Sequence, residues 1–246
     1  GTYLAVAHYS SPYITIYKRS GDTFAKLSNP SSLPTNTALG CAFSPDGTYL
    51  AVAHAGSPYI TIYKRSGDTF TKVSDPSTLP TGPGNGCAFS PDGTYLVVAH
   101  YTSPYITIYK RSGDAFAKLD NPSSLPTGDG LGCAFSPDGM YLAVAHDNSP
   151  YITIYERSGD TFTKLSNPST LPTNTGYDCA FSPDGTYLAV AHDSSPRITI
   201  YKGGGGEYRA NLYIDGSTYD LGSLLGYAVE SGTSNETKKV VKLFKI

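Results

Sequence analysis

Histidine recurs at a fixed spacing along the chain, and it is the residue type best suited to metal binding, proton transfer or pH sensing. The five histidines stand 46 residues apart, at His8, His54, His100, His146 and His192. Metal ligands must lie about 2.1 Å from one ion, whereas equivalent residues of separate repeats are held much farther apart. We therefore expect no metal site, and we expect each histidine to end a strand beside a loop that could contact a ligand.

Tyrosine and aspartate provide the remaining candidates for binding. Tyr9, Tyr101 and Tyr177 lie in segments where the copies of the repeat differ, and tyrosine gives a large contact area at a low entropic cost. Asp147 and Asp193 directly follow a histidine. The candidate ligand-binding residues are therefore Tyr9, His8, His54, His100, Tyr101, His146, Asp147, Tyr177, His192 and Asp193.

Catalytic motifs are not recognisable in the sequence. We find no Ser-His-Asp set, paired carboxylates, HExxH motif or phosphate-binding loop. An active site needs an asymmetric cluster of side chains, whereas near-identical copies supply symmetry. We therefore expect no catalytic residues and no cofactor, and we expect that the protein is not an enzyme.

Composition limits the classes of partner. The 246 residues are 39% hydrophobic and carry a net charge of −2, with lysine and arginine spread through the repeats. This content permits a packed core, and it offers neither a basic stripe for nucleic acid nor an apolar run of the ~20 residues that cross a bilayer. We expect no nucleic-acid or membrane partner.

The four cysteines, at positions 41, 87, 133 and 179, share one place in the repeat, so we expect small buried residues rather than disulfides. The chain opens with "GTYLAVAH", which elsewhere follows "SPD", so we expect a fragment of a longer repeat array.

One copy of the repeat predicts four short antiparallel strands, at residues 40–44, 48–54, 59–65 and 70–74. The segments "SPDG" (44–47), "AGSP" (55–58) and "SGD" (66–68) have the composition of turns. A period of 46 residues with four strands and no helical pattern is typical of a propeller blade. We predict an all-β propeller and consider a β-solenoid the weaker alternative.

The stretch "AFSPDGTYLAVA…ITIYK" resembles the blades of WD-type and YVTN-type propellers over roughly residues 1–202. The resemblance implies the propeller fold, with the F-S-P-D-G turn between the first and second strands of a blade. The chain contains no tryptophan, and Tyr63, Tyr109 and Tyr155 stand about where WD repeats have theirs.

The last part of the chain departs from the repeat. We assign residues 1–214 to propeller repeats and residues 215–246 to a segment that completes or closes the ring. The second strand of the blade occurs five times and the first only four times, so the first blade lacks its inner strand. Residues 207–214 predict the fifth outer strand, and residues 223–231 and 238–246 predict two more strands. We predict five blades, with six sheets as the alternative.

The two ends of the blades differ in variability. The "SPDG" and "RSGD" turns hardly change, whereas the loops at the other end differ between copies: residues 9–13, 55–59, 101–105, 147–151 and 193–197, with 36–40, 82–86, 128–132 and 174–178. We call this end the variable face and the other end the constant face. Because substitutions concentrate there, we predict that the variable face binds a ligand.

The function that we expect is multivalent attachment or adhesion to a glycan or protein. A protein–protein scaffold is the alternative, and a propeller hydrolase or lactonase is the third reading. Near-identical blades would also permit a homo-oligomer or a blade-swapped assembly. "GYAVESGTSNETKKVVKLF" near the end resembles terminal segments of bacteriophage structural proteins, which implies a virion-associated or extracellular setting.

Overall fold

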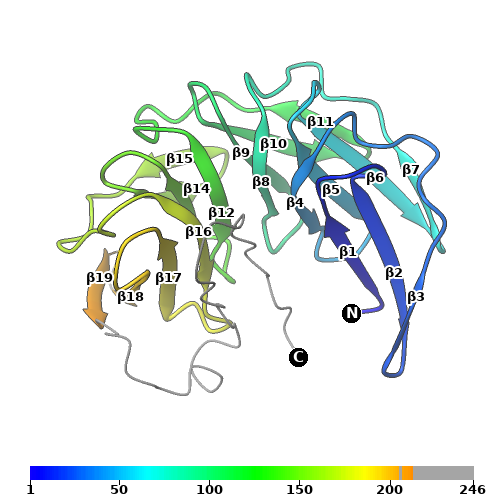
Figure 1. Ribbon diagram of the computed structural model, residues 1–246. Helices are drawn as coiled ribbons and strands as arrows, with labels where there is room; N and C mark the ends of the chain where they lie inside the picture. Colours follow the sequence, from blue (N-terminus) through cyan, green and yellow to red (C-terminus); the bar gives the residue numbers. More distant parts are fainter. Residues whose placement is uncertain (205–206, 213–246) are drawn as a thin grey trace.

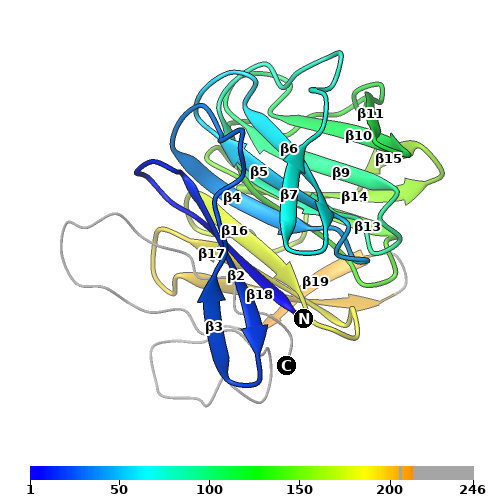
Figure 2. The ribbon, with the colours of Figure 1, turned by 90° about the vertical axis from the view of Figure 1, so that its right-hand side faces the viewer.

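Five antiparallel sheets follow one another around a common centre in the computed structural model (Figures 1 and 2). The structure describes residues 1–204 and 207–212. The first sheet has three strands and the other four sheets have four strands each. This confirms the predicted all-β propeller, of which the described residues form five sheets. Within the described residues, no helix could span a membrane.

The strands of each blade follow in chain order from the centre outwards. The first blade contains β1 (Tyr3–Ala7), β2 (Ile14–Ser20) and β3 (Thr23–Lys26). The second contains β4 (Ala38–Phe43), β5 (Tyr49–His54), β6 (Ile60–Ser66) and β7 (Thr69–Lys72). The third contains β8 (Gly84–Phe89), β9 (Tyr95–His100), β10 (Ile106–Ser112) and β11 (Ala115–Lys118). The fourth contains β12 (Gly130–Phe135), β13 (Tyr141–His146), β14 (Ile152–Ser158) and β15 (Thr161–Lys164). The fifth contains β16 (Gly176–Phe181), β17 (Tyr187–His192), β18 (Ile198–Gly204) and β19 (Glu207–Leu212).

The middle strands of a blade are buried on both faces, because a neighbouring blade covers each face. All six residues of β5 are buried, and so are those of β9. The register pairs Leu50 with Tyr63 and Val52 with Thr61, which places large side chains side by side across the sheet. Strands with apolar residues on both faces require cover on both sides, and this accounts for the stacking of the sheets.

The "SPDG" turn is fixed by its own polar side chains. In the second blade, Asp46 Oδ1 accepts hydrogen bonds from the Ser44 hydroxyl at 2.6 Å and from the Thr48 backbone N–H at 2.9 Å. Gly47 has a φ of 67°, which is accessible to glycine without steric strain. The aspartate of the motif is therefore occupied by the turn, as the sequence predicts.

A tyrosine, a lysine, an aspartate and an arginine connect each of the first three blades to the next at the constant face. The Tyr3 hydroxyl donates to Asp68 Oδ1 of the second blade at 2.6 Å, and Lys18 Nζ lies 2.8 Å from Asp68 Oδ2. The Arg65 guanidinium lies 4.8 Å from the centre of the Tyr3 ring, in a cation–π contact. We call this set the blade clasp. It recurs as Tyr49, Lys64, Asp114 and Arg111, and as Tyr95, Lys110, Asp160 and Arg157.

Apolar contacts support the blade clasp. Phe70 of the second blade packs edge-on against Tyr3 of the first, with ring centres 5.9 Å apart. Nearer the axis, the Cys87 thiol points at the Ala51 carbonyl oxygen of the preceding blade, at 3.6 Å. None of the four cysteines takes part in a disulfide. The cysteines are therefore small residues of the seam between blades, and no disulfide forms.

One tyrosine on the third strand of each of three blades, Tyr63, Tyr109 and Tyr155, is fully buried. The Tyr63 hydroxyl donates to the Ser32 carbonyl oxygen at 2.8 Å, and Tyr109 and Tyr155 donate in the same way to Thr78 and Ser124. Each hydroxyl thus ties the third strand to the long connection that enters its blade, and this satisfies a polar group in the core.

The fifth blade contains the predicted outer strand, because β19 pairs with β18. The two further strands predicted at residues 223–231 and 238–246 lie outside the described residues. The closing segment 215–246 and the phage-like stretch lie outside them as well.

The blade clasp predicts a stability difference between two equivalent aspartates. Asp114→Ala removes the acceptor of the Tyr49 hydroxyl and the partner of Lys64, so we expect its thermal midpoint to fall by a few degrees. Asp22 holds the same turn position at the end of the described arc, so Asp22→Ala serves as the matched control for the change in the turn. Thermal unfolding monitored by circular dichroism gives both midpoints. Equal losses in the two variants would show that the blade clasp does not contribute.

Candidate functional site

The short loops of the variable face share one backbone shape. Each contains a cis Ser–Pro bond followed by a residue with positive φ, such as Ser57–Pro58 and then Tyr59 at 68°. The Tyr59 N–H donates to the Gly56 carbonyl oxygen at 2.7 Å and closes the loop. The differences between blades reside in the first two loop positions, and in the fifth position of the last loop, where Arg197 replaces a tyrosine.

The histidines lie beneath these loops and bond to the neighbouring strand. His54 is fully buried, and its Nε2 lies 2.9 Å from the hydroxyl of Thr61. The same contact is made by His8, His100, His146 and His192 with Thr15, Thr107, Thr153 and Thr199. The structure thus gives each ring a partner at the strand end. Ligand contact by the histidines stays a prediction.

Burial controls the titration of these rings. Removal from water lowers the pKa of both His54 and His146 to about 4, and it lowers the pKa of His100 and His192 as well. Nδ1 of His146 is buried with no hydrogen-bond partner, whereas Nδ1 of His100 lies 2.9 Å from the Tyr101 carbonyl oxygen. These four rings are therefore neutral at physiological pH.

An asymmetric group of polar side chains lies where the variable face meets the axis of the ring. Asn85 is on the inner strand β8, at the position of Leu39, Leu131 and Tyr177 in the other blades. Its side chain is 8% exposed, and Nδ2 donates to the Gly130 carbonyl oxygen at 2.8 Å. A buried amide replaces an apolar or aromatic side chain here, so this position breaks the symmetry of the copies.

Two half-buried carboxylates lie beside this amide. Asp129 immediately precedes β12, and its Oδ1 accepts the Thr102 backbone N–H at 3.3 Å. Asp147 follows β13, and its Oδ1 accepts the backbone N–H of Asp129 at 2.8 Å. The third and fourth blades are therefore joined through Asp129. We call Asn85, Tyr101, Asp129 and Asp147 the axial cluster.

Tyr101 completes the axial cluster from the loop after β9. Its pKa is raised, first by burial and then by the negative charges of Asp129, Tyr9 and Asp147, whereas a hydrogen bond with Asn85 acts in the opposite direction. Each of these groups therefore acts on the Tyr101 hydroxyl. Tyr101 consequently remains protonated at neutral pH and acts as a hydrogen-bond donor.

The predicted site residues divide into three sets. The structure brings Tyr9, Tyr101 and Asp147 together, and it places the five histidines beneath the loops. Tyr177 lies on β16, and Asp193 faces Arg197 at 3.6 Å. A role for each of these residues in binding stays a prediction.

Asn85 and Asp129 were not predicted. A comparison of the four long connections position by position identifies both, because Asn85 aligns with Leu39, Leu131 and Tyr177 and Asp129 aligns with Thr37, Pro83 and Thr175. In the described part of the chain, no group of three or more histidine, cysteine, aspartate or glutamate residues could hold a metal ion. We therefore derive no step through a metal.

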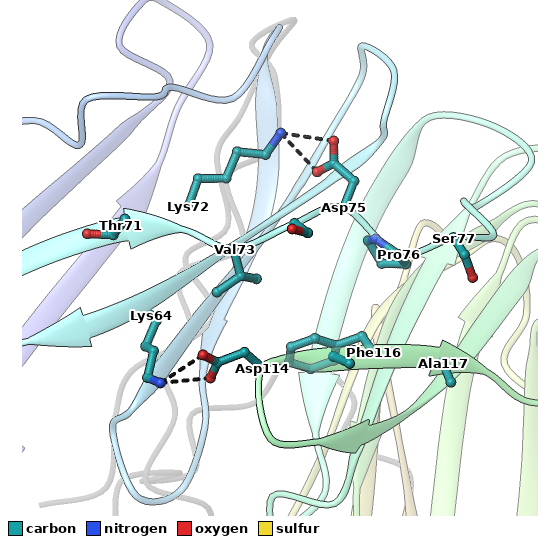
Figure 3. Close-up of a pocket in the computed structure, with 12 residues that line it drawn as sticks. Lys64, Thr71, Lys72, Val73, Asp75, Pro76, Ser77, Asp114, Phe116 and Ala117 are labelled. Atoms are coloured by element: carbon teal, nitrogen blue, oxygen red, sulfur yellow. Dashed lines mark hydrogen bonds and ion pairs between the residues drawn. The ribbon is translucent and has the colours of Figure 1, made fainter.

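A hollow lies at the outer edge, between the second and third blades (Figure 3). It has a volume of about 680 Å³, and its walls include Val73, Pro76 and Phe116. Figure 3 shows that its charges are paired with one another, Lys72 with Asp75 at 2.9 Å and Lys64 with Asp114 at 2.8 Å. Because Lys64 and Asp114 belong to the blade clasp, this hollow is part of a seam between blades. It is a weaker candidate for an active site than the axial cluster.

Comparisons with known proteins point to one family. Residues 1–205 match the family model described as "Lactonase, 7-bladed beta-propeller". No curated protein matches the chain in sequence. The model confirms the propeller part of the resemblance, whereas the specific likeness to WD-type and YVTN-type repeats is not confirmed.

Solved structures share the fold at low sequence identity. A candidate 6-phosphogluconolactonase from Bacteroides uniformis is 17% identical with a TM-score of 0.70, over 87% of this chain and 69% of its own. A candidate 6-phosphogluconolactonase from Bacteroides fragilis is 18% identical with a TM-score of 0.66, over 85% and 66%. The periplasmic gluconolactonase of Pseudomonas aeruginosa is 20% identical with a TM-score of 0.65, over 88% and 69%. The chain thus spans about two thirds of the length of these proteins.

The buried histidines predict a loss of stability in mild acid. An unfolded histidine takes up a proton below about pH 6.5, whereas folded His54 and His146 resist protonation down to about pH 4. The unfolded state therefore binds more protons between these values, and stability falls as pH falls through this window. Each such histidine steepens the fall by up to about 1.4 kcal/mol per pH unit. Urea unfolding between pH 7.5 and 4.5 measures the slope.

The variant His146→Gln removes one titrating ring and keeps a polar group near Thr153. We expect a shallower slope than in the unsubstituted protein, because one fewer proton is taken up on unfolding. Carboxylates such as Asp46, whose pKa is lowered mainly by its bond with Ser44, change stability only below this window. An unchanged slope in the variant would contradict the assignment.

Proposed function

Because the chain belongs to the lactonase family of seven-bladed β-propellers, we propose that it is a hydrolase that opens cyclic esters at the axial cluster. The observation that carries this proposal is the convergence of two carboxylates, an amide and a protonated phenol from the third and fourth blades. These are the group types that hydrolysis of an ester requires: a base and hydrogen-bond donors for the carbonyl oxygen.

The expectations of a non-enzymatic attachment module and of a protein scaffold are wrong, because the match over residues 1–205 is to a family of lactonases. The same finding contradicts the adhesion reading and the phage-like structural reading, and it favours the third reading, a propeller hydrolase or lactonase. The error has a physical source. Near-identical strands suggested a symmetric ring, whereas a few loop substitutions are sufficient to build an asymmetric cluster.

Asp129 is the group that we assign as general base. It immediately precedes the inner strand β12. Its Oδ1 accepts the Thr102 N–H at 3.3 Å, whereas Oδ1 of Asp147 accepts the Asp129 N–H at the shorter distance of 2.8 Å. Asp129 is therefore the less occupied carboxylate of the two. It accepts a proton from water as the water oxygen attacks the carbonyl carbon of the lactone. Asp147 is a positioning residue, because it holds the backbone N–H of Asp129.

Tyr101 and Asn85 are the groups that we assign to the carbonyl oxygen. The raised pKa of Tyr101 keeps its hydroxyl protonated, so the hydroxyl can donate to the oxygen that gains negative charge. The Asn85 amide carries two N–H groups, of which one donates to Gly130 and the other can donate to the substrate. When the ring C–O bond breaks, the leaving oxygen takes the proton held by Asp129, and the product is a hydroxy acid.

Substitutions in the axial cluster test this assignment. Asn85→Leu inserts the side chain that β4 and β12 carry at the equivalent position, so the fold should accept it. We expect kcat/KM for a simple six-membered lactone to fall by about 10²-fold, because one donor to the developing oxyanion is lost. Asp129→Asn removes the base and should cost about 10²-fold or more. Release of acid in a weakly buffered indicator solution follows the reaction.

Asp75→Asn is the matched control, because it removes a carboxylate from the outer hollow and leaves the axial cluster intact. Its kcat/KM should equal that of the unsubstituted protein. Lactone hydrolysis that persists unchanged in both Asn85→Leu and Asp129→Asn would place the chemistry elsewhere.

A further inference from the structure

A further carboxylate lies on the inner strand of the fifth blade, next to the blade that contains Asp147. Asp178 is on β16, at the position that Gly40, Gly86 and Gly132 hold in the other inner strands. Its Oδ1 accepts the Cys179 N–H at 2.9 Å. A Cβ added to Gly132 would lie 2.7 Å from the Asp178 Cα, so the two strands approach each other closely there. Asp178 therefore adds negative charge to the axial end of the fourth and fifth blades.

Most cations of the described residues are paired with other groups. On the constant face, Nε atoms donate to carbonyl oxygens of the "SPDG" turns, from Arg65 to Gly47, Arg111 to Gly93 and Arg157 to Gly139. Lysines form the ion pairs of the blade clasp on that face, Lys18, Lys64 and Lys110. On the variable face, Arg197 donates to the Asp193 carbonyl oxygen and lies 3.6 Å from its carboxylate.

This distribution of charge disfavours an anionic substrate. A phosphate monoester carries a charge of about −1.5 to −2 at neutral pH and is bound most strongly by arginine or lysine. Near Asp129, Asp147 and Asp178 it would meet like charges, which are repulsive at short range. Ionised carboxylates only accept hydrogen bonds, so they suit the hydroxyl groups of an uncharged polyol.

We propose that the substrates are uncharged polyhydroxylated lactones, and that Asp178 determines specificity by repelling lactones that carry a phosphate. The inference rests on the proposed function and names its substrate class. It assigns a role to Asp178 that differs from proton transfer, since the base is Asp129.

The test compares glucono-1,5-lactone with its 6-phosphorylated form. We expect kcat/KM to favour the uncharged lactone by about 100-fold, from repulsion by several carboxylates. Added salt should raise kcat/KM for the phosphorylated lactone and leave the other unchanged, because salt screens the repulsion. Equal or faster hydrolysis of the phosphorylated lactone would overturn this inference and leave the proposed function intact. Hydrolysis of neither lactone would contradict the proposed function itself.

Asp178→Asn isolates the contribution of one charge. The amide oxygen can still accept the Cys179 N–H. We expect the preference for the uncharged lactone to narrow about fivefold, because kcat/KM rises for the phosphorylated lactone alone. Asp178→Gly, the residue of the other inner strands, is a second variant if the first folds poorly. Asp75→Asn removes an equal charge at the outer edge and should leave the preference unchanged. A preference unaltered by both Asp178 variants would refute the role of Asp178.

Discussion

The contact between neighbouring blades is the interaction on which the structure depends. A four-stranded sheet with large apolar side chains on both faces is not stable alone, because each face must be covered. At the first three seams, Tyr, Lys, Asp and Arg meet at the constant face with an aromatic pair behind them, and a cysteine lies near the axis at every seam between the described blades. Each of these groups meets a partner one blade along the chain. A blade therefore completes the core of its neighbour, and the fold is built by repetition of one contact.

The same constraint explains where function can arise. The residues that hold the blades together lie in the strands and at the constant face, so the loops of the variable face can change without loss of packing. Asn85 replaces the leucine of two other inner strands, and Asp129 and Asp147 occupy loop positions that vary between copies. Three substitutions on a nearly symmetric frame are sufficient to bring an acid pair, an amide and a phenol together. Symmetry of the scaffold thus says little about symmetry of the site.

Most of the fold could be predicted from the sequence, and the site could be predicted only in part. Strand alternation, the "SPDG" turn and the 46-residue period correctly indicate the four strands of a blade, and residues 207–212 form the predicted outer strand. These features are local or periodic. The axial cluster depends on distance from the ring axis, which a period does not encode. Tyr101 and Asp147 could be named as loop residues, whereas Asn85 and Asp129 stand out only when the long connections are compared position by position, and their proximity to Tyr101 only in the structure.

The fourth blade departs from the blade clasp by one reversal of charge. Glu156 stands where Lys18, Lys64 and Lys110 stand, and the following blade has "GGGG" at 203–206 in place of "RSGD". The lysine and the aspartate that it would meet are thus absent from the same seam. Copies so similar risk docking in the wrong order while the chain folds. If the fourth blade docked against an "RSGD" turn, a glutamate would face an aspartate. This repulsion favours the fifth blade, which lacks that aspartate, as the neighbour of the fourth.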